Sequence, residues 1–378
     1  MASFRNLTKS HHNRVLTFEV HDIDVCIVNA LRRILWNDIE NVALFFEVND
    51  VKHSDINVLV NTSPTHNEFV AQRISLIPLH FNAKEIESFE KMRYKFVINK
   101  QNTTYDTIGV TTDDIQIIDM ESGEQVDKSF RDRVFPRNKI TKNPIVITKL
   151  KPNLDNPQNG NTLVVEAFAT KGTKEKHTCY CPISGASYFN SIDKKAADEA
   201  FKTFDGTRVA FDSMEAQRNF YKNKYGEPTR FQFEIETECA LTPEYLMTKA
   251  FDVLISKLTN LQDGLGQRND DVVKVHIPSN DETDADLINV SIFKETHTLG
   301  NVMQCLLYNT HIRGGQSQLK YVGYNCPHPL QQTCILRLSF KEVMDDKDVR
   351  DFLGSSIQGM ITDITKYKSE WLKTTTPS

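Results

Sequence analysis

VCIVNALRRILW, residues 25–36, is the segment from which the architecture of the chain can be worked out. A fainter copy, HTLGNVMQCLL, occupies residues 297–307. In both segments apolar residues recur at i, i+3, i+4, i+7 and i+8, the spacing that places them on one face of an α-helix. These apolar residues are Ile27, Ala30, Leu31, Ile34 and Leu35 in the first segment, and Leu299, Val302, Met303, Leu306 and Leu307 in the second.

The elements around the two predicted helices repeat as well. Strands are predicted at 15–20, 41–50, 56–60 and 231–235, and Pro243 opens a long helix to about Gln262. Asp22 or Asp24 is expected to cap the first repeat helix. The same order then returns, with strands at 272–277, 287–293, 319–325 and 333–340, a helix at 298–309, and a last helix from three early aspartates to Trp371. This double occurrence predicts an α+β fold built from two pseudo-symmetric halves, each a sheet plus helices.

An insert and a linker separate the predicted halves. Short alternating runs divided by Asn- and Pro-rich loops predict a β-rich insert, with helices at 67–77, 193–204 and 213–225. Two glycines and several polar residues favour a linker after the long helix. We expect a first dimerisation half at 1–52 plus 229–262, an insert domain at 53–228, a linker at 263–271 and a second dimerisation half at 272–378.

Neither half can bury its apolar helix face alone, so pairing about a pseudo-twofold axis is expected. Five aliphatic side chains per helix, at about 1.5–3 kcal/mol each, would contribute on the order of 10 kcal/mol before entropy is subtracted. The linker lowers that entropy cost because tethered modules meet at roughly millimolar effective concentration. The ten apolar residues named above are therefore the predicted dimer interface.

Composition and charge exclude several classes of protein. A net charge of -5 and a pI near 6.1 argue against a surface that binds nucleic acid as a whole. No apolar run approaches the roughly 18 residues that cross a bilayer, and the first residues lack the apolar core of a signal peptide. We therefore expect an intracellular protein with no membrane contact.

The seven cysteines do not form a disulfide or metal-binding pattern. Only Cys179 and Cys181 are close, and alternation in a strand is favoured over a metal or redox site. His297 has no nucleophile pattern beside it, and Thr298 suggests a helix cap there. Asn29 and Asn301 are expected to satisfy local backbone or interface polar groups.

Several separated motifs carry a resemblance to known proteins. NALRR (29–33), FVAQRISLIPL (69–79), ATKGTKEKH (169–177) and LTP (241–243) resemble successive signatures of the third-largest subunit of eukaryotic RNA polymerase II, which has an archaeal equivalent and is related to the bacterial α amino-terminal domain. HTLGN (297–301), Gly323-Tyr324, PHPL (327–330) and Glu370-Trp371 resemble the eleventh subunit of the same enzyme and its archaeal equivalent. The motifs follow the correct order along nearly the whole chain.

The resemblance implies a fused heterodimer that serves as a non-catalytic assembly platform in a DNA-directed RNA polymerase, a nucleotidyltransferase. Its implied partners are the two largest subunits and small subunits of the tenth and twelfth types, with DNA reached only through the complex. Such a fusion resembles the arrangement in large cytoplasmic DNA viruses, which implies a viral factory in the host cytoplasm and packaging in the virion, and leaves the nucleus open. The residues implied to dock the large subunits are Asn29, Arg32, Arg33, Arg73, Lys171, Gly172 and His177, and the two arginines of the first repeat helix are expected to face outward.

The sequence also departs from the family pattern. Residues 81–170 contain no cysteine, so the family's zinc or iron–sulfur centre is not expected and no cofactor is predicted. Gln72 and Ser75 stand where histidine and glycine are usual, and Ala30 where serine is usual, which affects partner contacts rather than the fold.

Two other functions stay open. Six basic residues and one acid between 128 and 142 would suit an independent nucleic-acid-binding protein or an acidic partner, although a solvated loop explains them equally well. An enzyme with its own active site is disfavoured, because paired carboxylates, a nucleophile motif and metal-ligand spacing are all missing from the sequence.

Overall fold

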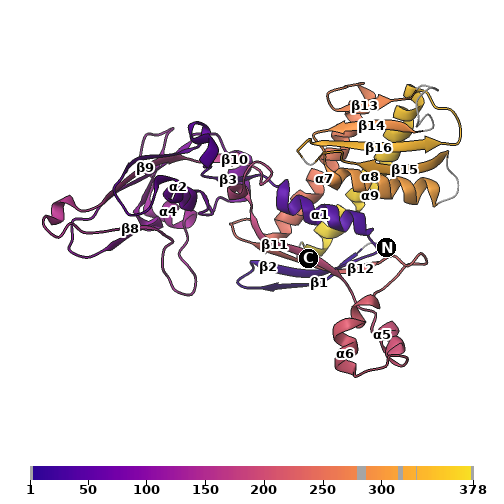
Figure 1. Ribbon diagram of the computed structural model, residues 1–378, viewed down its shortest axis with the longest axis horizontal. Helices are drawn as coiled ribbons and strands as arrows, with labels where there is room; N and C mark the ends of the chain where they lie inside the picture. The colour runs from indigo at the N-terminus through magenta and orange to yellow at the C-terminus, as the bar shows by residue number, and fades with distance from the viewer. Residues whose placement is uncertain (1–2, 279–286, 314–317, 329, 376–378) are drawn as a thin grey trace. The chain divides into compact units, whose positions relative to one another are not determined.

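The computed structural model describes residues 3–278, 287–313, 318–328 and 330–375. The chain forms two compact units. The pairing unit comprises Met1–Leu35, Ala186–Ile235 and Glu244–Ser378, and the insert unit comprises Trp36–Gly185 and Glu236–Pro243. Figure 1 shows the helices and strands of both units.

The first half of the pairing unit contains a sheet in the order β1-β2-β12-β11. Alternation in β12 turns Phe231, Phe233 and Ile235 into the core, where each is fully buried. Asp24 caps the first repeat helix, since its Oδ1 accepts a hydrogen bond of 2.9 Å from the Cys26 amide. The elements are β1 Ser3–Ser10, β2 Val15–His21, α1 Val25–Asn37, β11 Ile183–Asn190, β12 Arg230–Thr237 and α7 Pro243–Gly266.

The second half repeats this plan with an antiparallel sheet in the order β13-β14-β16-β15. The strands predicted at 319–325 and 333–340 are confirmed at those residues. An Asp345 carboxylate caps the last helix by accepting a 2.7 Å hydrogen bond from the Asp348 amide. The elements are β13 Val273–His276, β14 Ile288–Phe293, α8 His297–Leu307, a π-helical turn Tyr308–Ile312, β15 Leu319–Asn325, β16 Thr333–Phe340 and α9 Asp346–Thr375.

Helices α1, α7, α8 and α9 lie between the two sheets of the pairing unit (Figure 1). This arrangement confirms the α+β class with two sheet-plus-helix halves. No helix in the described part of the chain is both long enough and apolar enough to cross a membrane.

The insert unit is rich in β structure. Its main sheet has the order β4-β9-β5-β7, and two short ribbons pair β6 with β8 and β3 with β10. The buried faces of these strands include Phe96, Ile98, Ile117 and Val165. The strands are β3 Asn41–Ala43, β4 Ile56–Asn61, β5 Tyr94–Gln101, β6 Ile108–Thr111, β7 Ile115–Asp119, β8 Val146–Leu150, β9 Thr162–Phe168 and β10 Thr170–Gly172, with helices α2 Asn67–Ser75, α3 Ala83–Glu87 and α4 Lys128–Val134.

A pair of short helices, α5 Lys194–Phe201 and α6 Arg208–Met214, interrupts the first sheet between β11 and β12. It has a small core of its own around Phe211. By compactness this segment clusters with the pairing unit, whereas the sequence pattern groups residues 53–228 into one insert domain.

Three secondary-structure predictions are wrong. The strand expected at 41–50 stops at Ala43, and a 3-10 segment follows at Val48–His53. The helix expected at 213–225 is instead a 3-10 turn at Ala216–Arg218, followed by two isolated β-bridges and a turn at Gly226, whose φ is +82°. Cys179 lies in a 3-10 turn at Thr178–Tyr180 rather than in a strand.

The stretch expected to be linker begins as helix. α7 continues through Gly266, because apolar Leu265 is buried and extends the helix's packed face beyond Gln262. The motif 327–330 includes Pro329, which lies outside the described residues.

Candidate assembly interface

Helices α1 and α8 contact each other through two side-chain pairs. The Arg33 Nε donates a 2.8 Å hydrogen bond to the Thr298 hydroxyl, and the Cys26 and Cys305 thiols interact with each other. The alignment that places Asn29 on Asn301 also places Cys26 on Thr298 and Arg33 on Cys305. The two contacts are therefore equivalent under exchange of the halves, as an isologous twofold interface requires.

The predicted interface residues are largely out of solvent. Nine of the ten apolar side chains are buried, and Leu306 is half-buried. Ile27 from α1 and Leu306 from α8 line the same cavity of about 250 Å³. The interaction with Cys305, together with burial, raises the pKa of the Cys26 thiol, so this thiol stays protonated inside the interface.

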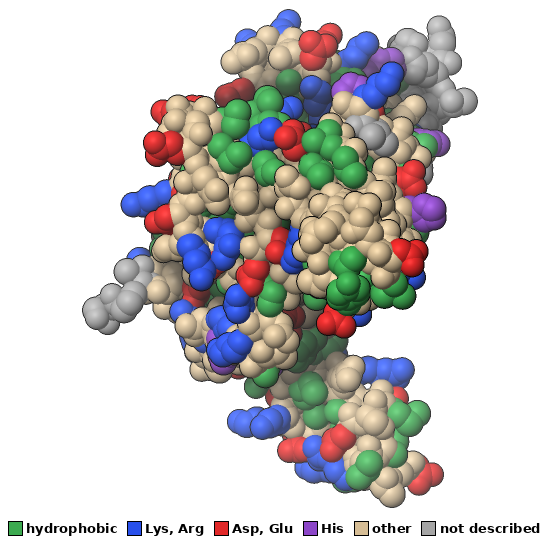
Figure 2. Space-filling view, turned by 90° about the vertical axis from the view of Figure 1, so that its left-hand side faces the viewer, with side chains coloured by type: hydrophobic (Ala, Val, Ile, Leu, Met, Phe, Trp, Pro, Cys, Tyr) green, Lys and Arg blue, Asp and Glu red, His purple; other side chains and the backbone are tan. Residues whose placement is uncertain are grey.

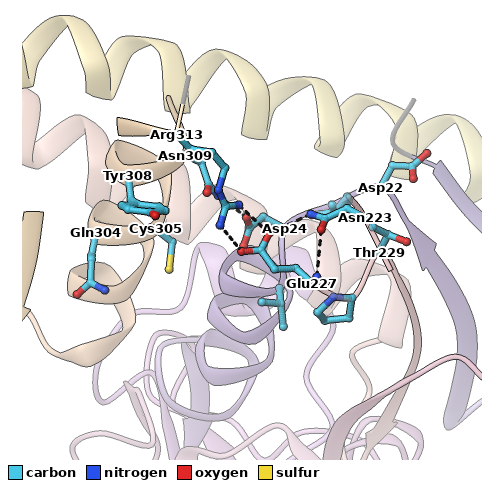
Figure 3. A pocket seen from close by; sticks show the side chains of 13 residues that line it. Asp22, Asp24, Asn223, Glu227, Thr229, Gln304, Cys305, Tyr308, Asn309 and Arg313 are labelled. Carbon is cyan, nitrogen blue, oxygen red and sulfur yellow. Dashed lines mark hydrogen bonds and ion pairs between the residues drawn. The ribbon is translucent and has the colours of Figure 1, made fainter. Parts of the chain in front are cut away.

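A second polar contact region lies at the end of α8 (Figure 3). Asn309 donates a 2.7 Å hydrogen bond to the Asp24 carboxylate, which links the turn after α8 to the cap of α1. Arg313 donates two hydrogen bonds to Glu227, at 2.6 and 2.8 Å, and this pairing lowers the pKa of Glu227. These groups border a cavity of about 390 Å³. Because the carboxylates already accept hydrogen bonds, the region fastens the two halves rather than presenting an open site.

The long helices complete the pairing. Trp371 near the end of α9 is fully buried, and its ring centre lies 4.9 Å from that of Phe18 and 5.2 Å from that of Phe4. Its Nε1 donates to the Thr248 hydroxyl at 3.2 Å. A side chain of the second half thus fills the core of the first half, which neither half would close alone.

Family comparisons identify this arrangement. A model described as the RNA polymerase Rpb3/Rpb11 dimerisation domain matches residues 17–258, and a second model of the same description matches residues 287–370. The chain belongs to the RNA polymerase Rpb3/Rpb11 dimerisation family.

Curated relatives of this Rpb3/Rpb11-type chain are polymerase subunits. It is 26% identical over 199 residues to subunit 3B of DNA-directed RNA polymerases IV and V of Arabidopsis thaliana, which covers 49% of this chain and 56% of that protein. It is 24% identical over 304 residues to human DNA-directed RNA polymerases I and III subunit RPAC1, covering 66% and 81%. It is 24% identical over 281 residues to DNA-directed RNA polymerase subunit Rpo3 of Picrophilus torridus, covering 67% and 96%.

The structure gives the predicted docking arginines internal contacts. Arg32 Nε donates a 3.1 Å hydrogen bond to Asn29 on its own helix. Arg33 turns toward Thr298, so the expectation that both arginines face outward is wrong for Arg33. Arg73 Nε and Nη2 donate to the Ile147 and Val146 carbonyls at 2.7 and 2.8 Å, which anchors α2 on β8. Sequence spacing could not show these long-range acceptors.

The 169–177 motif forms a compact turn in the insert unit. β10 pairs with β3, and Lys171 Nζ lies 3.3 Å from the Glu40 carboxylate. Only glycine fits at Gly172, because a Cβ there would lie 2.8 Å from the Tyr180 ring. His177 Nδ1 accepts a 3.2 Å hydrogen bond from the Cys179 amide and so caps the following turn.

Three residues of the 297–301 motif have structural contacts. α8 begins at His297, whose ring meets Tyr324 edge-on at 5.8 Å. Thr298 lies inside the helix and accepts from Arg33, so the predicted cap at Thr298 is wrong. Asn301 accepts a weak hydrogen bond of 3.6 Å from the Cys305 thiol, in keeping with a local role.

The basic segment at 128–142 is partly neutralised within the insert unit. Arg131 pairs with Asp132, Arg133 with Glu85, and Arg137 with Asp113. The molecular face in the space-filling view carries basic and acidic side chains side by side (Figure 2). Three of the six basic side chains therefore already have carboxylate partners, which leaves a weaker attraction for a phosphate backbone.

Histidine, cysteine and acidic side chains do not cluster in the described ranges in any group of three or more that could hold a metal ion. Burial raises the pKa of Cys179 to about 12 and also raises that of Cys181. Both thiols are therefore poor thiolate ligands in this conformation.

Proposed function

We propose that this protein is a non-catalytic assembly-platform subunit of a multisubunit DNA-directed RNA polymerase. The observation that carries the proposal is the burial of Trp371, from the second half, against Phe4 and Phe18 of the first half. This packing supports the proposal that one chain supplies both members of an Rpb3/Rpb11-type pair. Its relatives named above are polymerase subunits, which supports the same role here.

In this role the chain pairs its halves in cis and holds the two largest subunits, while small subunits of the tenth and twelfth types bind nearby. The proposed docking residues are Asn29, Arg32, Arg33, Arg73, Lys171, Gly172 and His177. Several of these also shape the fold, since Arg73 anchors α2 and Gly172 fits beneath Tyr180. Catalysis belongs to the large subunits, no cofactor is bound by this chain, and DNA is contacted only through the complex.

The pairing of two family domains in one chain also leads us to propose a fused heterodimer of the kind carried by large DNA viruses. Transcription would then take place in a factory in the host cytoplasm, with the polymerase packaged in virions. Imaging a tagged chain in infected cells tests this part of the proposal separately.

Affinity purification of the tagged full-length chain, followed by mass spectrometry, tests the central proposal. We expect both largest polymerase subunits at near-stoichiometric amounts, together with the two small subunits. The matched control is the same chain carrying Leu31→Asp, which disrupts the buried interface. Absence of both large subunits from the wild-type eluate would overturn the proposed function.

A further inference from the structure

A cavity of about 210 Å³ in the insert unit, beside the β3–β10 ribbon, collects positive charge. Three lysines, Lys91, Lys171 and Lys176, contribute to its lining. They come from separate parts of the sequence, since Lys91 precedes β5, Lys171 lies in β10 and Lys176 lies in the turn after it. The fold therefore brings Lys91 together with two lysines that are far from it in the sequence.

Two of these ammonium groups lack carboxylate partners. Within the described ranges, neither Lys91 nor Lys176 lies within 4.0 Å of a carboxylate oxygen. Lys176 Nζ is instead 4.6 Å from the centre of the Phe45 ring, a contact that positions the cation without neutralising it. Lys171 pairs at 3.3 Å with Glu40, a side chain that is 60% exposed.

One carboxylate, Asp55, also lines this cavity and is held by hydroxyl groups. The Thr170 hydroxyl donates to Asp55 Oδ2 at 2.5 Å, and the Tyr180 hydroxyl donates to Thr170 at 2.7 Å. Burial raises the pKa of Asp55, although Lys91 and Lys176 act in the opposite direction. A single half-buried carboxylate leaves an excess of positive charge around the cavity.

We propose that this cavity binds a carboxylate side chain presented by another polymerase subunit. The inference rests on the proposed function for the source of that carboxylate. One further carboxylate would balance the excess positive charge around the cavity. The small volume of the cavity suits a single group of this kind.

A nucleic acid fits these observations less well. Phosphate backbones need cations along an extended track, whereas these lysines meet at one point. The Asp50 carboxylate lies 2.6 Å from His53, which lines the same cavity, and Glu40 is beside Lys171, so successive phosphates would meet negative charge.

A binding measurement on the purified full chain tests the site directly. The probe is a fluorescein-labelled hexaglutamate peptide, followed by anisotropy at low salt, with inorganic phosphate and a single-stranded oligonucleotide as competitors. We expect Lys91→Gln/Lys176→Gln to weaken peptide binding about tenfold, since two partly exposed charges are removed. Lys174→Gln is the matched control, because Lys174 stacks over the Trp36 ring at 4.1 Å in the same turn but does not line the cavity.

A second variant, expected to bind the peptide more tightly, excludes loss of folding as the cause of the weaker binding. Asp55→Asn keeps an oxygen that accepts from Thr170 but removes the negative charge, so peptide affinity is expected to rise severalfold. Misfolding cannot produce tighter binding. Equal binding by the double lysine variant, no gain in Asp55→Asn, or an oligonucleotide that binds more tightly than the peptide through the same lysines would each overturn the inference.

Recovery of the complex separates this inference from the proposed function. If wild-type chain recovers both large subunits and the double lysine variant loses them at lower salt than wild type, both proposals are supported. If the variant behaves as wild type, the carboxylate site is wrong and the platform role stands. If wild-type chain recovers neither large subunit, the platform role fails, and the assignment of the carboxylate to a polymerase subunit fails with it.

Discussion

Helices α1 and α8 are equivalent in the repeat, yet they pack on their sheets in different ways. α8 carries Gly300, where an added Cβ would lie 2.5 Å from Cys334 Sγ and 2.6 Å from the Tyr324 ring. The equivalent residue in α1 is Val28, which is buried with a full side chain. α8 therefore approaches its sheet more closely at this point than a side chain would allow, whereas α1 fills the same position with apolar volume.

The difference shows that the two halves are no longer interchangeable. The twofold makes the Arg33–Thr298 and Cys26–Cys305 contacts equivalent. One is an arginine–hydroxyl hydrogen bond, whereas the other is a pair of thiols. α8 also continues into a π-helical turn whose following residue, Arg313, bonds Glu227. Specialised contacts of this kind favour pairing within one chain over association of two identical halves.

The largest expected loss of stability comes from a charge placed in the apolar interface that α1 and α8 share. Leu31 and its repeat equivalent Met303 are both fully buried. Leu31→Asp and Met303→Asp should each cost about 3–5 kcal/mol or abolish folding, because the carboxylate would be buried without a partner. Soluble yield and urea unfolding measure this loss.

The matched control places the same charge on exposed Gln72 of α2, where little change is expected. Near-native stability of either interface variant would mean that the two helices do not share one buried interface.

The next largest loss of stability is expected at Gly300, where α8 lies close to its sheet. Gly300→Val should destabilise the protein by about 1–3 kcal/mol, since the new side chain would overlap Cys334 and Tyr324. Thermal unfolding of purified variants provides the measurement. Gly359→Val in α9 is the control, because nothing lies within 4 Å of a Cβ built there. Equal shifts in melting temperature for the two variants would remove the distinction between the helices.

The Arg33–Thr298 bond should contribute a smaller coupling. A double-mutant cycle of Arg33→Ala and Thr298→Ala is expected to give about 0.5–1.5 kcal/mol, the usual range for one partly buried hydrogen bond. Arg32→Ala with Thr298→Ala is the matched cycle and should give near-zero coupling, because Arg32 bonds Asn29. Similar coupling in both cycles would contradict the inward orientation of Arg33.

The smallest effect is the pH dependence of the contact at the end of α8. Arg313 holds the folded pKa of Glu227 below its ordinary value of 4.5. The pair therefore stabilises the folded state above that pH, and the contribution is lost as pH falls through the lowered folded pKa. We expect Glu227→Gln to be less stable than wild type at neutral pH and to match it in acid, as measured by urea unfolding. Arg313→Gln should show the same profile. A difference that is independent of pH would assign the effect to packing instead.

The repeat itself was predictable from sequence because amphipathic spacing and strand alternation are local signals. The bounds of β15 and β16, the cap at Asp24 and the acidic start of α9 all follow from such signals. The repeat alignment also implies the α1–α8 interface without knowledge of any contact. These features depend on residues a few positions apart.

The remaining features depend on contacts between distant residues. The direction of Arg33 is set by a hydroxyl on α8, and that of Arg73 by carbonyls on β8. The helix expected at 213–225 fails because Asn223 and Gly226 form a turn, with the Asn223 side chain accepting hydrogen bonds from the Tyr225 and Glu227 amides. The lysine-lined cavity gave no sequence signal, since its cations are dispersed along the chain.

Trp371 has a consequence for the order in which the protein acquires its structure during synthesis. The ribosome releases β1 and β2 early, but the aromatic ring that packs against Phe4 and Phe18 emerges only after both sheets have been made. Until then the first sheet exposes apolar side chains, a state in which nascent chains aggregate or recruit chaperones. Completion of this core is therefore a late event in folding, because it must wait for the helix that carries Trp371.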